Sequence, residues 1–381
     1  MINLDDYNDQ SAPAEWLEYY QEGGYFPIYI GDFFGENERY EILNKAGIGG
    51  FSLVWAARDH EENRYVSVKV IKADQSENNK ELAVLQRLQQ APSHEGLQHL
   101  PQLFDHFYVE RCGKKCLFLI TELLGPNIHD MFYGISIRPE IRSRSVTKQL
   151  LLAIDCLHSN GIVHGDIHEG NILFRLPASY NLPLDIVYKG EVLRNDGAPL
   201  EEELPDYVVV PMMEDQTYPL GHDWKDIVLI DFSSTFYVSD SPTHIDAVPN
   251  MTPPERIFRK SLSSAVDIWT LGCMTYQFAT GSRLLSFFGD SRRLIPAIYE
   301  KVGESAADWL LTSLLEAIHE GLWKDECTKW FPKLRQGRLL EDHPRRTQIS
   351  DHAFQFIRKC LVVDPTKRPA AGELQNEKWV V

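Results

Sequence analysis

Four groups of residues in this sequence have the types and spacing for phosphate chemistry. The first is a glycine-rich turn that starts at Gly47-Ile48-Gly49 and ends at Val54, with Ser52 where a third glycine would fall. Glycine has no Cβ atom, so its backbone can approach phosphates closely and point N–H groups at their oxygens. Alone this signal is weak, because a Gly-x-Gly in a hairpin is usually only a turn.

The second group pairs a lysine with a glutamate. Lys69 lies on a predicted strand just after the glycine turn, and Glu81 follows on a predicted helix. An ammonium is a point charge suited to two phosphate oxygens, and a carboxylate beside it could hold it in place. Taken singly, the two residues also fit a solvated strand lysine and a helix-surface glutamate.

The third and fourth groups supply carboxylates. The loop His164-Gly165-Asp166-Ile167-His168-Glu169-Gly170-Asn171 spaces Asp166 and Asn171 so that a carboxylate can face a hydroxyl while an amide oxygen reaches a metal. Ile230-Asp231-Phe232-Ser233 is an apolar strand ending in an aspartate, whose carboxylate could bind Mg²⁺ that bridges phosphates. Each motif alone could also consist of polar loop residues whose hydrogen bonds are satisfied within the protein. All four motifs in this order are not expected by chance.

The elements that must position these groups change character along the chain. Short strand-like runs at residues 25–30, 40–46, 51–58, 65–71 and 117–121, with one helix predicted at 76–89, indicate a mostly antiparallel sheet. Helical spacing dominates later, at residues 146–157 before the stop Asn160-Gly161, and at 265–278, 309–319 and 352–361.

Residues 176–226 interrupt this helical part. They carry repeated prolines and the acidic run Glu201-Glu202-Glu203. Few apolar positions recur periodically there, so we expect an acidic, proline-rich insert that contributes little to either core.

Composition restricts the class of protein. The chain has 381 residues, 43% of them hydrophobic, and its 38 Lys and Arg against 55 Asp and Glu give a charge of −17. This charge disfavours nucleic-acid and anionic-membrane partners, and it suits either a basic partner or simply a soluble acidic protein. Six cysteines without zinc spacing indicate reduced thiols, and the lack of a secretory signal and of an apolar run of about 20 residues predicts a location in the cytoplasm or nucleus. A monomer is expected.

Together the four groups resemble the signature of the protein kinases. Further matches are Pro253-Pro254-Glu255, Asp267-Ile268-Trp269-x-Leu271-Gly272 and Asp364-Pro365-x-x-Arg368-Pro369. The resemblance implies a bilobal α+β kinase fold: an N-terminal extension at 1–39 packing on the N-lobe, an antiparallel β N-lobe with one main helix at 40–121, and a mostly α C-lobe at 122–381. It also implies an ion pair of Glu255 with Arg368, and anchoring of the catalytic loop by Asp267.

Carried onto this sequence, the resemblance implies ATP and Mg²⁺ as cofactors. Lys69, braced by Glu81, would hold the α- and β-phosphates. Asp231 and Asn171 would ligate Mg²⁺, and Asp166 would orient the substrate hydroxyl and accept its proton. His168 stands where a lysine normally meets the γ-phosphate. The implied nucleotide-binding residues are Ala46, Gly47, Gly49, Ser52, Val54, Lys69, Glu81, Thr121, Glu122 and Leu124.

A narrower resemblance is to the SR protein kinases. It rests on Gly23-Gly24-Tyr25, Ile30-Gly31-Asp32, Arg39-Tyr40 and Phe51-Ser52-x-Val54-Trp55, and on the insert between Asn171 and Asp231. It implies basic, Arg/Ser-rich protein substrates. Gly165 replaces the arginine with which many kinases read an activation-loop phosphate, so activity without loop phosphorylation is expected, with the loop ordered by Phe236, Tyr237 and Ile245.

Other positions depart from the kinase pattern. His168 is shorter than a lysine and only partly charged near neutral pH, and Ser233 restricts the backbone after Asp-Phe. Val248 falls near where a threonine usually bonds the catalytic aspartate. Other departures bear on Arg/Ser specificity: Thr252 and Pro249 where SR protein kinases carry arginines, and Arg292-Arg293 near Asp290 in the expected docking stretch. The run Arg142-Ser143-Arg144-Ser145 is expected to be a solvated helix surface.

Two other functions compete with a protein kinase. The loop from His164 to Asn171 also resembles that of aminoglycoside and choline kinases, which lack the glycine loop in this form, the Pro254-Glu255 pair and the Asp267 motif. A pseudokinase scaffold is the third possibility. The intact set of phosphoryl-transfer residues argues against it.

Overall fold

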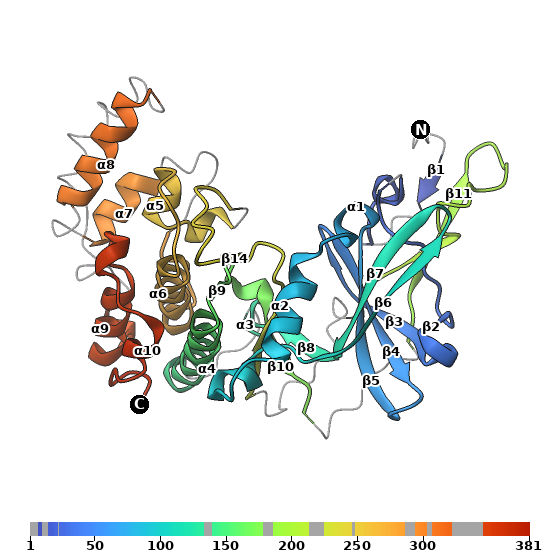
Figure 1. Ribbon diagram of the computed structural model, residues 1–381, viewed down its shortest axis with the longest axis horizontal. Coiled ribbons are helices and arrows are strands. Elements are labelled where there is room, and N and C mark those ends of the chain that lie inside the picture. The colour runs from blue at the N-terminus through green and yellow to red at the C-terminus, as the bar shows by residue number, and fades with distance from the viewer. Residues whose placement is uncertain are drawn as a thin grey trace. The chain divides into compact units, whose positions relative to one another are not determined.

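The computed structural model in Figure 1 describes residues 7–9, 14–21, 23–132, 139–177, 186–212, 225–245, 248–285, 294–302, 307–321 and 346–381. Contacts divide the chain into two compact units. The first comprises residues 1–90, 101–126 and 175–224, and the second comprises 91–100, 127–174 and 225–381. The chain therefore changes unit several times. The predicted lobe boundaries after residues 39 and 121 stay predictions.

The first unit is built on a six-stranded antiparallel sheet in the order β2-β3-β4-β5-β7-β6 (Figure 1). β4 and β5 pair without a break from Ser52↔Ile71 to Asp59↔Arg64. The inward side chains, such as Trp55, Val68 and Phe118, form the core. The strands are β2 (Phe33–Phe34), β3 (Tyr40–Gly49), β4 (Ser52–Asp59), β5 (Arg64–Ile71), β6 (Leu103–Arg111) and β7 (Lys114–Glu122), and β8 (Leu124–Asn127) follows.

The main helix of this unit is shorter than predicted. Instead of one helix over residues 76–89, the structure has α1 (Ala73–Ser76) and α2 (Lys80–Gln89). Asn78 adopts a positive φ of 51°, which breaks the helix, and the side chain of Asn79 then caps α2 by accepting the N–H of Leu82 at 2.9 Å. This cap places Glu81 in the first turn of α2.

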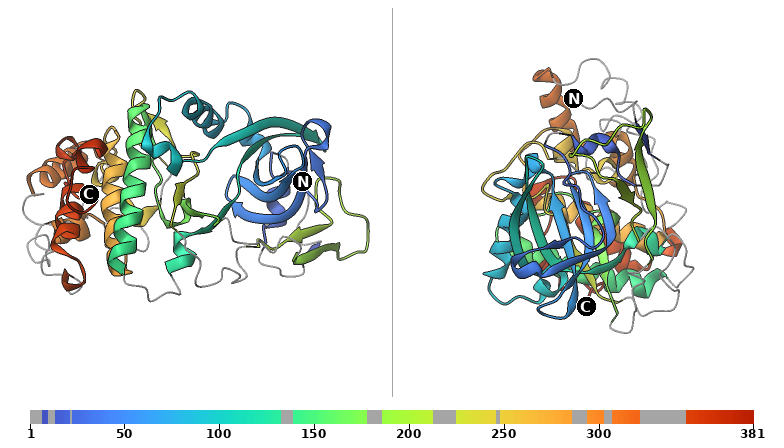
Figure 2. Two further views of the ribbon diagram at one scale, coloured as in Figure 1. Left: turned by 90° about the horizontal axis from the view of Figure 1, so that it is seen from below. Right: turned by 90° about the vertical axis from the view of Figure 1, so that its right-hand side faces the viewer.

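The insert does not behave as an unpacked spacer. Its described residues form β11 (Lys189–Arg194) and β12 (Tyr207–Val209), which make a three-stranded antiparallel sheet with β1 (Tyr7–Asp9). Figure 2 shows this yellow-green hairpin beside the blue N-terminal strands. Leu204 and Val209 lie in the same apolar cluster as Trp55.

The expectation that this segment contributes little to either core is therefore wrong for residues 186–212. β11 does alternate exposed and buried positions, with Gly190 and Val192 inside. Its six residues are too short a pattern to stand out among prolines and acidic residues.

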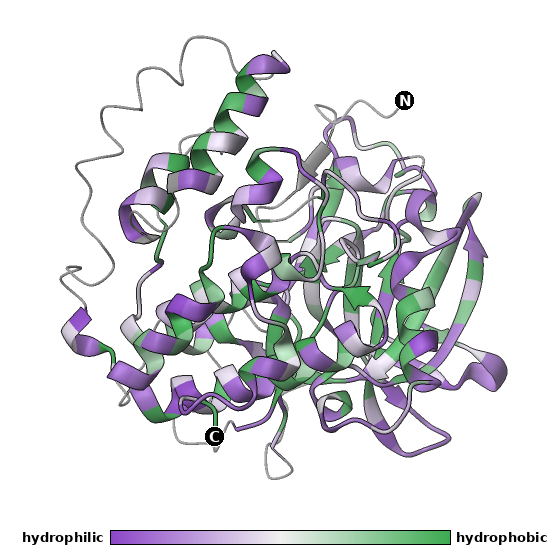
Figure 3. Ribbon diagram, turned by 60° about the vertical axis from the view of Figure 1, so that its left-hand side comes forward, coloured by the Kyte–Doolittle hydropathy of each residue, from purple (hydrophilic) through white to green (hydrophobic). Residues whose placement is uncertain are grey.

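The second unit is mostly helical, as expected. The predicted helices at 265–278, 309–319 and 352–361 are confirmed, and α4 stops before Gly161, whose φ is +69°. In Figure 3 the outer helices carry alternating hydrophobic and hydrophilic stripes. The helices are α3 (Ile128–Phe132), α4 (Pro139–Ser159), α5 (Pro254–Ile257), α6 (Ala265–Thr280), α7 (Leu294–Val302), α8 (Ala307–His319), α9 (Asp351–Cys360) and α10 (Ala371–Leu374).

Two short antiparallel pairs complete this unit and carry its loops. β9 (Ile162–Val163) pairs with β14 (Phe236–Tyr237), and β10 (Ile172–Arg175) pairs with β13 (Ile227–Leu229). Among the described residues, no helix is both long and apolar enough to cross a membrane.

The expected ion pair of Glu255 and Arg368 is present and buried. The guanidinium donates to both carboxylate oxygens, at 2.8 and 3.1 Å, and also to the backbone carbonyls of Val362 and Ala265. Removing one member of such a pair costs about 3–5 kcal/mol, because the other charge is left buried and uncompensated. This pair ties the start of α5 to the start of α6 and to the C-terminal segment.

The structure contradicts one expectation about the start of α4. The run Arg142-Ser143-Arg144-Ser145 does lie on this helix, and Arg144 and Ser145 are exposed. Ser143, however, is completely buried. The helix turns it inward next to Val146 and Thr147, which are also buried, so the run is not a uniformly solvated surface.

Candidate active site

Asp267 holds the loop that carries Asp166. From the first turn of α6 its buried carboxylate accepts the N–H groups of His164 and Gly165, each at 2.9 Å, and lies 2.9 Å from His158 Nε2. Burial would raise the pKa of Asp267, but the hydrogen bond from His158 and the loop amides hold it below its usual value. The predicted anchoring of the catalytic loop is confirmed.

The backbone conformation explains why a glycine occurs at position 165. Gly165 adopts φ +81°, and a Cβ atom there would lie 2.9 Å from the carbonyl oxygen of Ser234. An arginine would be strained in this conformation and would clash with the following loop. The local backbone therefore disfavours the arginine of the kinase pattern at this position.

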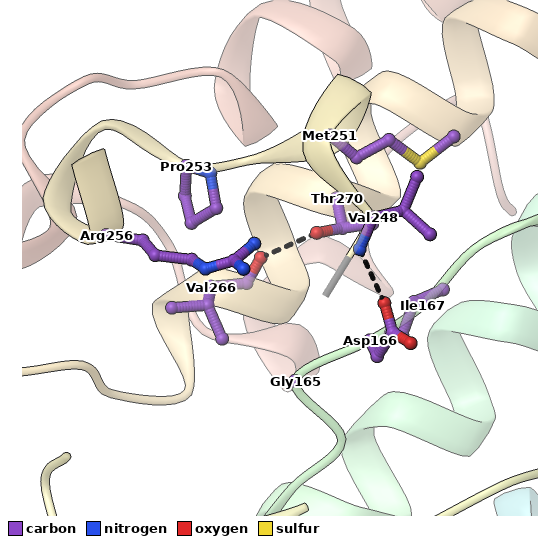
Figure 4. A pocket seen from close by; sticks show the side chains of 9 residues that line it. All are labelled: Gly165, Asp166, Ile167, Val248, Met251, Pro253, Arg256, Val266 and Thr270. Carbon is purple, nitrogen blue, oxygen red and sulfur yellow. Dashed lines mark hydrogen bonds between the residues drawn. The ribbon is translucent and has the colours of Figure 1, made fainter. Parts of the chain in front are cut away.

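Asp166 is oriented by the segment that follows the activation loop. Its Oδ1 accepts the backbone N–H of Val248 at 2.9 Å, shown as a dashed line in Figure 4. A main-chain donor thus contacts the carboxylate near where the kinase pattern has a threonine hydroxyl. Asp166 borders a small pocket lined by Gly165, Asp166, Ile167, Val248, Met251, Pro253, Arg256, Val266 and Thr270 (Figure 4).

His168 faces the other oxygen of Asp166. Its Nδ1 accepts the N–H of Gly170 at 3.0 Å, so the proton of the neutral ring is on Nε2, which lies 3.6 Å from Asp166 Oδ2. A Cβ atom at Gly170 would lie 2.9 Å from the imidazole, so a side chain at this position would force the ring to move. The ring is positioned as a donor directed at the carboxylate.

Asn171 and Asp231 lie at the same end of a strand pair. Asn171 directly precedes β10 and Asp231 follows β13, and the N–H of Ile230 donates to the carbonyl of Asn171 at 2.9 Å. The amide nitrogen of Asn171 donates to the carbonyl of Asp166 at 3.0 Å, which leaves the amide oxygen as the group able to ligate a cation. A carboxylate and an amide oxygen are the donors that Mg²⁺ prefers.

The backbone at Asp231 is unusual and held by its neighbours. Its φ is +68°, a left-handed conformation that aspartate tolerates better than most residues, and Oδ1 accepts the N–H of Ser233 at 3.2 Å. Phe232 is fully buried, with its ring centroid 5.5 Å from that of His164. Ser233 itself is not among the described residues with positive φ, so this conformation does not require a glycine there.

In the first unit, the glycine turn closes the hairpin of β3 and β4. Gly47 pairs with Val54 and Gly49 pairs with Ser52. A Cβ atom at Gly47 would meet nothing within 4 Å, so this position lies against open space that an added side chain would occupy. Such a turn fits a phosphate cradle because its backbone can be approached closely.

Lys69 and Glu81 meet as the sequence predicts. Lys69 Nζ lies 2.6 Å from Glu81 Oε2, on β5 and α2 respectively. Thr121 pairs with Ser67 at the end of β7, and the next residue, Glu122, accepts two hydrogen bonds from Arg175 at 2.7 and 3.0 Å. Ala46 lies on β3, which precedes β5 in the sequence, and Leu124 lies on β8, which follows β7.

Three residues next to the glycine turn had no predicted contact with it. Glu15 and Lys45 form a buried ion pair, and the hydroxyl of Tyr25 donates to the carbonyl of Gly49 at 2.5 Å. The one signal in the sequence is a lysine inside a predicted strand. The register of β3 shifts between Ile42 and Asn44, so alternation alone does not place Lys45 inside.

Asp290 and Arg292-Arg293, in the expected docking stretch, lie outside the described residues. Within the described part of the chain, no cluster of three or more His, Cys, Asp or Glu side chains is arranged to hold a metal ion.

Comparisons with known proteins identify the family. A family model for the protein kinase domain matches residues 40–184 and 220–380. The chain is 31% identical over 184 residues to the serine/threonine-protein kinase SKY1 of Saccharomyces cerevisiae, covering 46% of this chain and 24% of that protein. It is 33% identical over 166 residues to the protein kinase dsk1 of Schizosaccharomyces pombe, covering 42% and 30%. The chain thus matches less than a third of the length of these two relatives.

Two further likenesses extend along nearly the whole chain. The serine/threonine protein kinase AFUB_078980 of Aspergillus fumigatus is 25% identical over 386 residues, covering 96% of this chain and 90% of that protein. The crystal structure of the PF14_0431 kinase domain superposes with a TM-score of 0.67 at 18% identity, covering 93% and 98% of the two chains, which shows the fold alone. The chain therefore belongs to the protein kinase family, and within it resembles the serine/threonine kinases of SR protein kinase type.

Proposed function

We propose that this chain transfers the γ-phosphate of ATP to serine or threonine hydroxyls of protein substrates. The observation that carries the proposal is the orientation of Asp166. Its carboxylate receives the N–H of Val248 on a loop that Asp267 anchors. This hydrogen bond fixes the position of one carboxylate oxygen. The other oxygen is able to accept the proton of a substrate hydroxyl.

The groups expected to hold ATP and Mg²⁺ fit that role. The Lys69–Glu81 pair is formed, which leaves an ammonium positioned by a carboxylate and suited to the α- and β-phosphates. Asp231 and Asn171 supply the oxygen donors for Mg²⁺, which when bound neutralises charge on the phosphates. The open space at Gly47 supports a phosphate cradle.

His168 is proposed to replace the usual lysine of the catalytic loop. With its proton on Nε2 it can donate a hydrogen bond, but it lies 3.6 Å from Asp166 and reaches less far than a lysine. Its contribution to charge stabilisation is therefore expected to be smaller, and phosphoryl transfer slower.

Basic, Arg/Ser-rich proteins are the proposed substrates. The support is the resemblance to the SR-type relatives and the charge of −17, which favours encounter with positively charged proteins. The small-molecule phosphotransferase is not favoured, because the protein kinase model matches both parts of the chain. A pseudokinase scaffold is not favoured either, because Lys69 and Glu81 are paired.

Activity without activation-loop phosphorylation is part of the proposal. Phe236 and Ile245 pack in one apolar cluster with Val163, Leu262 and Val266, and β14 pairs with β9. This packing supports an activation loop that is held without a phosphate, and the left-handed backbone at Gly165 disfavours the arginine that would read one.

Turnover of radiolabelled ATP tests the function. The protein is assayed with a basic Arg/Ser peptide, with an aminoglycoside or choline, and without acceptor. We expect label only in the peptide. Label in the aminoglycoside or choline would instead identify a small-molecule kinase, and no transfer to any acceptor with intact ATP binding would identify a pseudokinase.

A further inference from the structure

A buried ion pair lies beside the glycine turn. Lys45 Nζ is 2.6 and 2.5 Å from the two carboxylate oxygens of Glu15, and neither side chain has any exposed surface. The hydroxyl of Tyr20 donates to the same carboxylate, and the ammonium lies 4.8 Å from the ring centroid of Trp55. A segment from the N-terminal extension thus reaches into the core of the first unit.

Lys45 is also held through its backbone. It lies on β3 two residues before Gly47, where the register with β4 shifts. Its N–H donates to Asn44 Oδ1 and its carbonyl accepts the N–H of Met212, both at 2.8 Å. Asn44 Nδ2 donates in turn to the carbonyl of Ile186 at 2.8 Å. The insert therefore holds β3 at the point where it leads into the turn.

Tyr25 makes a direct contact with the glycine turn. Its buried hydroxyl donates to the carbonyl of Gly49 at 2.5 Å. Lys114 Nζ donates to the backbone carbonyl of Tyr25 at 3.0 Å, and the ring packs edge-on against Tyr20. Burial raises the pKa of Tyr25 to about 12, so the hydroxyl keeps its proton and remains a donor at neutral pH.

The N-terminal segment and the insert are joined to each other. β1 pairs with β11, and Leu17 packs in one apolar cluster with Val192 and Val208. We call residues 14–21, 23–25 and 186–212 the clamp. They contact β3 at Asn44 and Lys45, and they contact the turn at Gly49.

Stability alone is a poor reason for this arrangement. A buried ion pair is often no more stable than well-packed apolar side chains of similar volume, but it does require one geometry. We propose that the clamp positions the glycine-rich turn for nucleotide, with Lys45 and Tyr25 as positioning residues. This inference rests on the proposed function of the turn as the phosphate cradle for ATP.

The sharpest test removes one hydroxyl. Tyr25→Phe deletes the donor to Gly49 and keeps the ring. The net value of one such bond, about 0.5–1.5 kcal/mol, corresponds to about a 2- to 12-fold change. We expect the KM for ATP and the Kd of MgATP to rise by about that factor, with kcat changed less than twofold.

Tyr40→Phe is the matched control. Tyr40 is also buried and starts the same strand, but its hydroxyl donates to Asp105 at 3.0 Å, far along β3 from Gly49. We expect it to lower the melting temperature by an amount similar to Tyr25→Phe and to leave the KM for ATP unchanged. Equal rises in KM for both variants would overturn the proposal, because a general loss of stability would then explain them.

A double substitution distinguishes a loss of positioning of the glycine turn from a loss of protein stability. The double variant Glu15→Gln, Lys45→Met removes both charges and keeps an acceptor for Tyr20. We expect a melting temperature near that of the parent, with weaker ATP binding. Unchanged ATP affinity in both this variant and Tyr25→Phe would overturn the role of the clamp.

Calorimetric measurement of MgATP binding distinguishes a failure of the clamp proposal from a failure of the proposed kinase function. A parent protein that binds MgATP but transfers no phosphate would contradict the proposed kinase activity, and the effect of Tyr25→Phe on the Kd would still test the clamp. A parent protein that binds no MgATP would overturn both.

Discussion

The two units each contain a fully buried ion pair, and the two pairs differ in how completely their polar groups are satisfied. Arg368 donates to both oxygens of Glu255 and to backbone carbonyls around it. Lys45 is bonded to Glu15 and otherwise faces the ring of Trp55. Burial lowers the pKa of Lys45, whereas an arginine cannot lose its proton in a protein.

The two ion pairs also stabilise different parts of the molecule. The Arg368 pair fastens the elements around the loop of Asp166, where the chemistry is proposed to occur. The Lys45 pair lies on the strand that leads into the glycine turn, where nucleotide is proposed to bind. Changes at the Arg368 pair or at Asp166 should therefore affect folding or rate, and changes in the clamp should affect ATP affinity.

The largest expected effect comes from Asp166→Asn. The amide can no longer accept the proton of the hydroxyl, so kcat should fall by roughly 10²- to 10⁴-fold while the Kd of MgATP stays within about twofold. Steady-state kinetics and calorimetry measure the two quantities. Turnover at the parental rate would show that Asp166 is not the base.

Next in size is the loss of a carboxylate from each ion pair. Glu255→Ala should destabilise the protein by about 3–5 kcal/mol, because the Arg368 charge remains buried. Glu15→Ala should cost less, because Lys45 can release its proton. Urea unfolding of the two variants at pH 7.5 compares them. An equal or larger loss for Glu15→Ala would break the comparison between the pairs.

A smaller effect is expected from pH through His164. Burial holds the pKa of His164 below its ordinary value, so the unfolded chain binds a proton there more readily than the folded protein. The resulting stability is present above about pH 6.5 and is lost as pH falls toward the folded value, by at most about 1.4 kcal/mol per pH unit. Urea unfolding between pH 7.5 and 5.5 should show a shallower decline for His164→Gln than for the parent.

The smallest effect is expected in the activation loop. Ser239, Ser241 and Thr243 are exposed, and the apolar side chains around them already hold the loop. Each alanine variant should change kcat by less than about threefold, or roughly 0.7 kcal/mol, and phosphatase-treated protein should stay active. A large loss after phosphatase treatment, restored by rephosphorylation, would contradict this.

The predictable part of the site consists of short motifs with local geometry. Lys69 lies within a strand, Asn171 and Asp231 lie at strand ends, Glu81 lies in a first helical turn and Asp166 lies in a loop after a helix, so their elements could be placed from spacing. The pairing of Glu255 with Arg368 was also predictable, through the family resemblance. The backbone donor at Val248 was not, because a main-chain N–H has no signature in side-chain type.

By itself, the sequence determined the fold class, the family and the residues of the proposed chemistry, because each rests on local patterns or on motifs a few residues long. Only the tertiary structure decided that residues 186–212 pack with the first unit, and that Glu15 meets Lys45 across 30 positions. Such contacts depend on strand register and on which distant segment covers a buried side chain. A one-residue shift in β3 reverses which side chains face inward, and no local pattern encodes that shift.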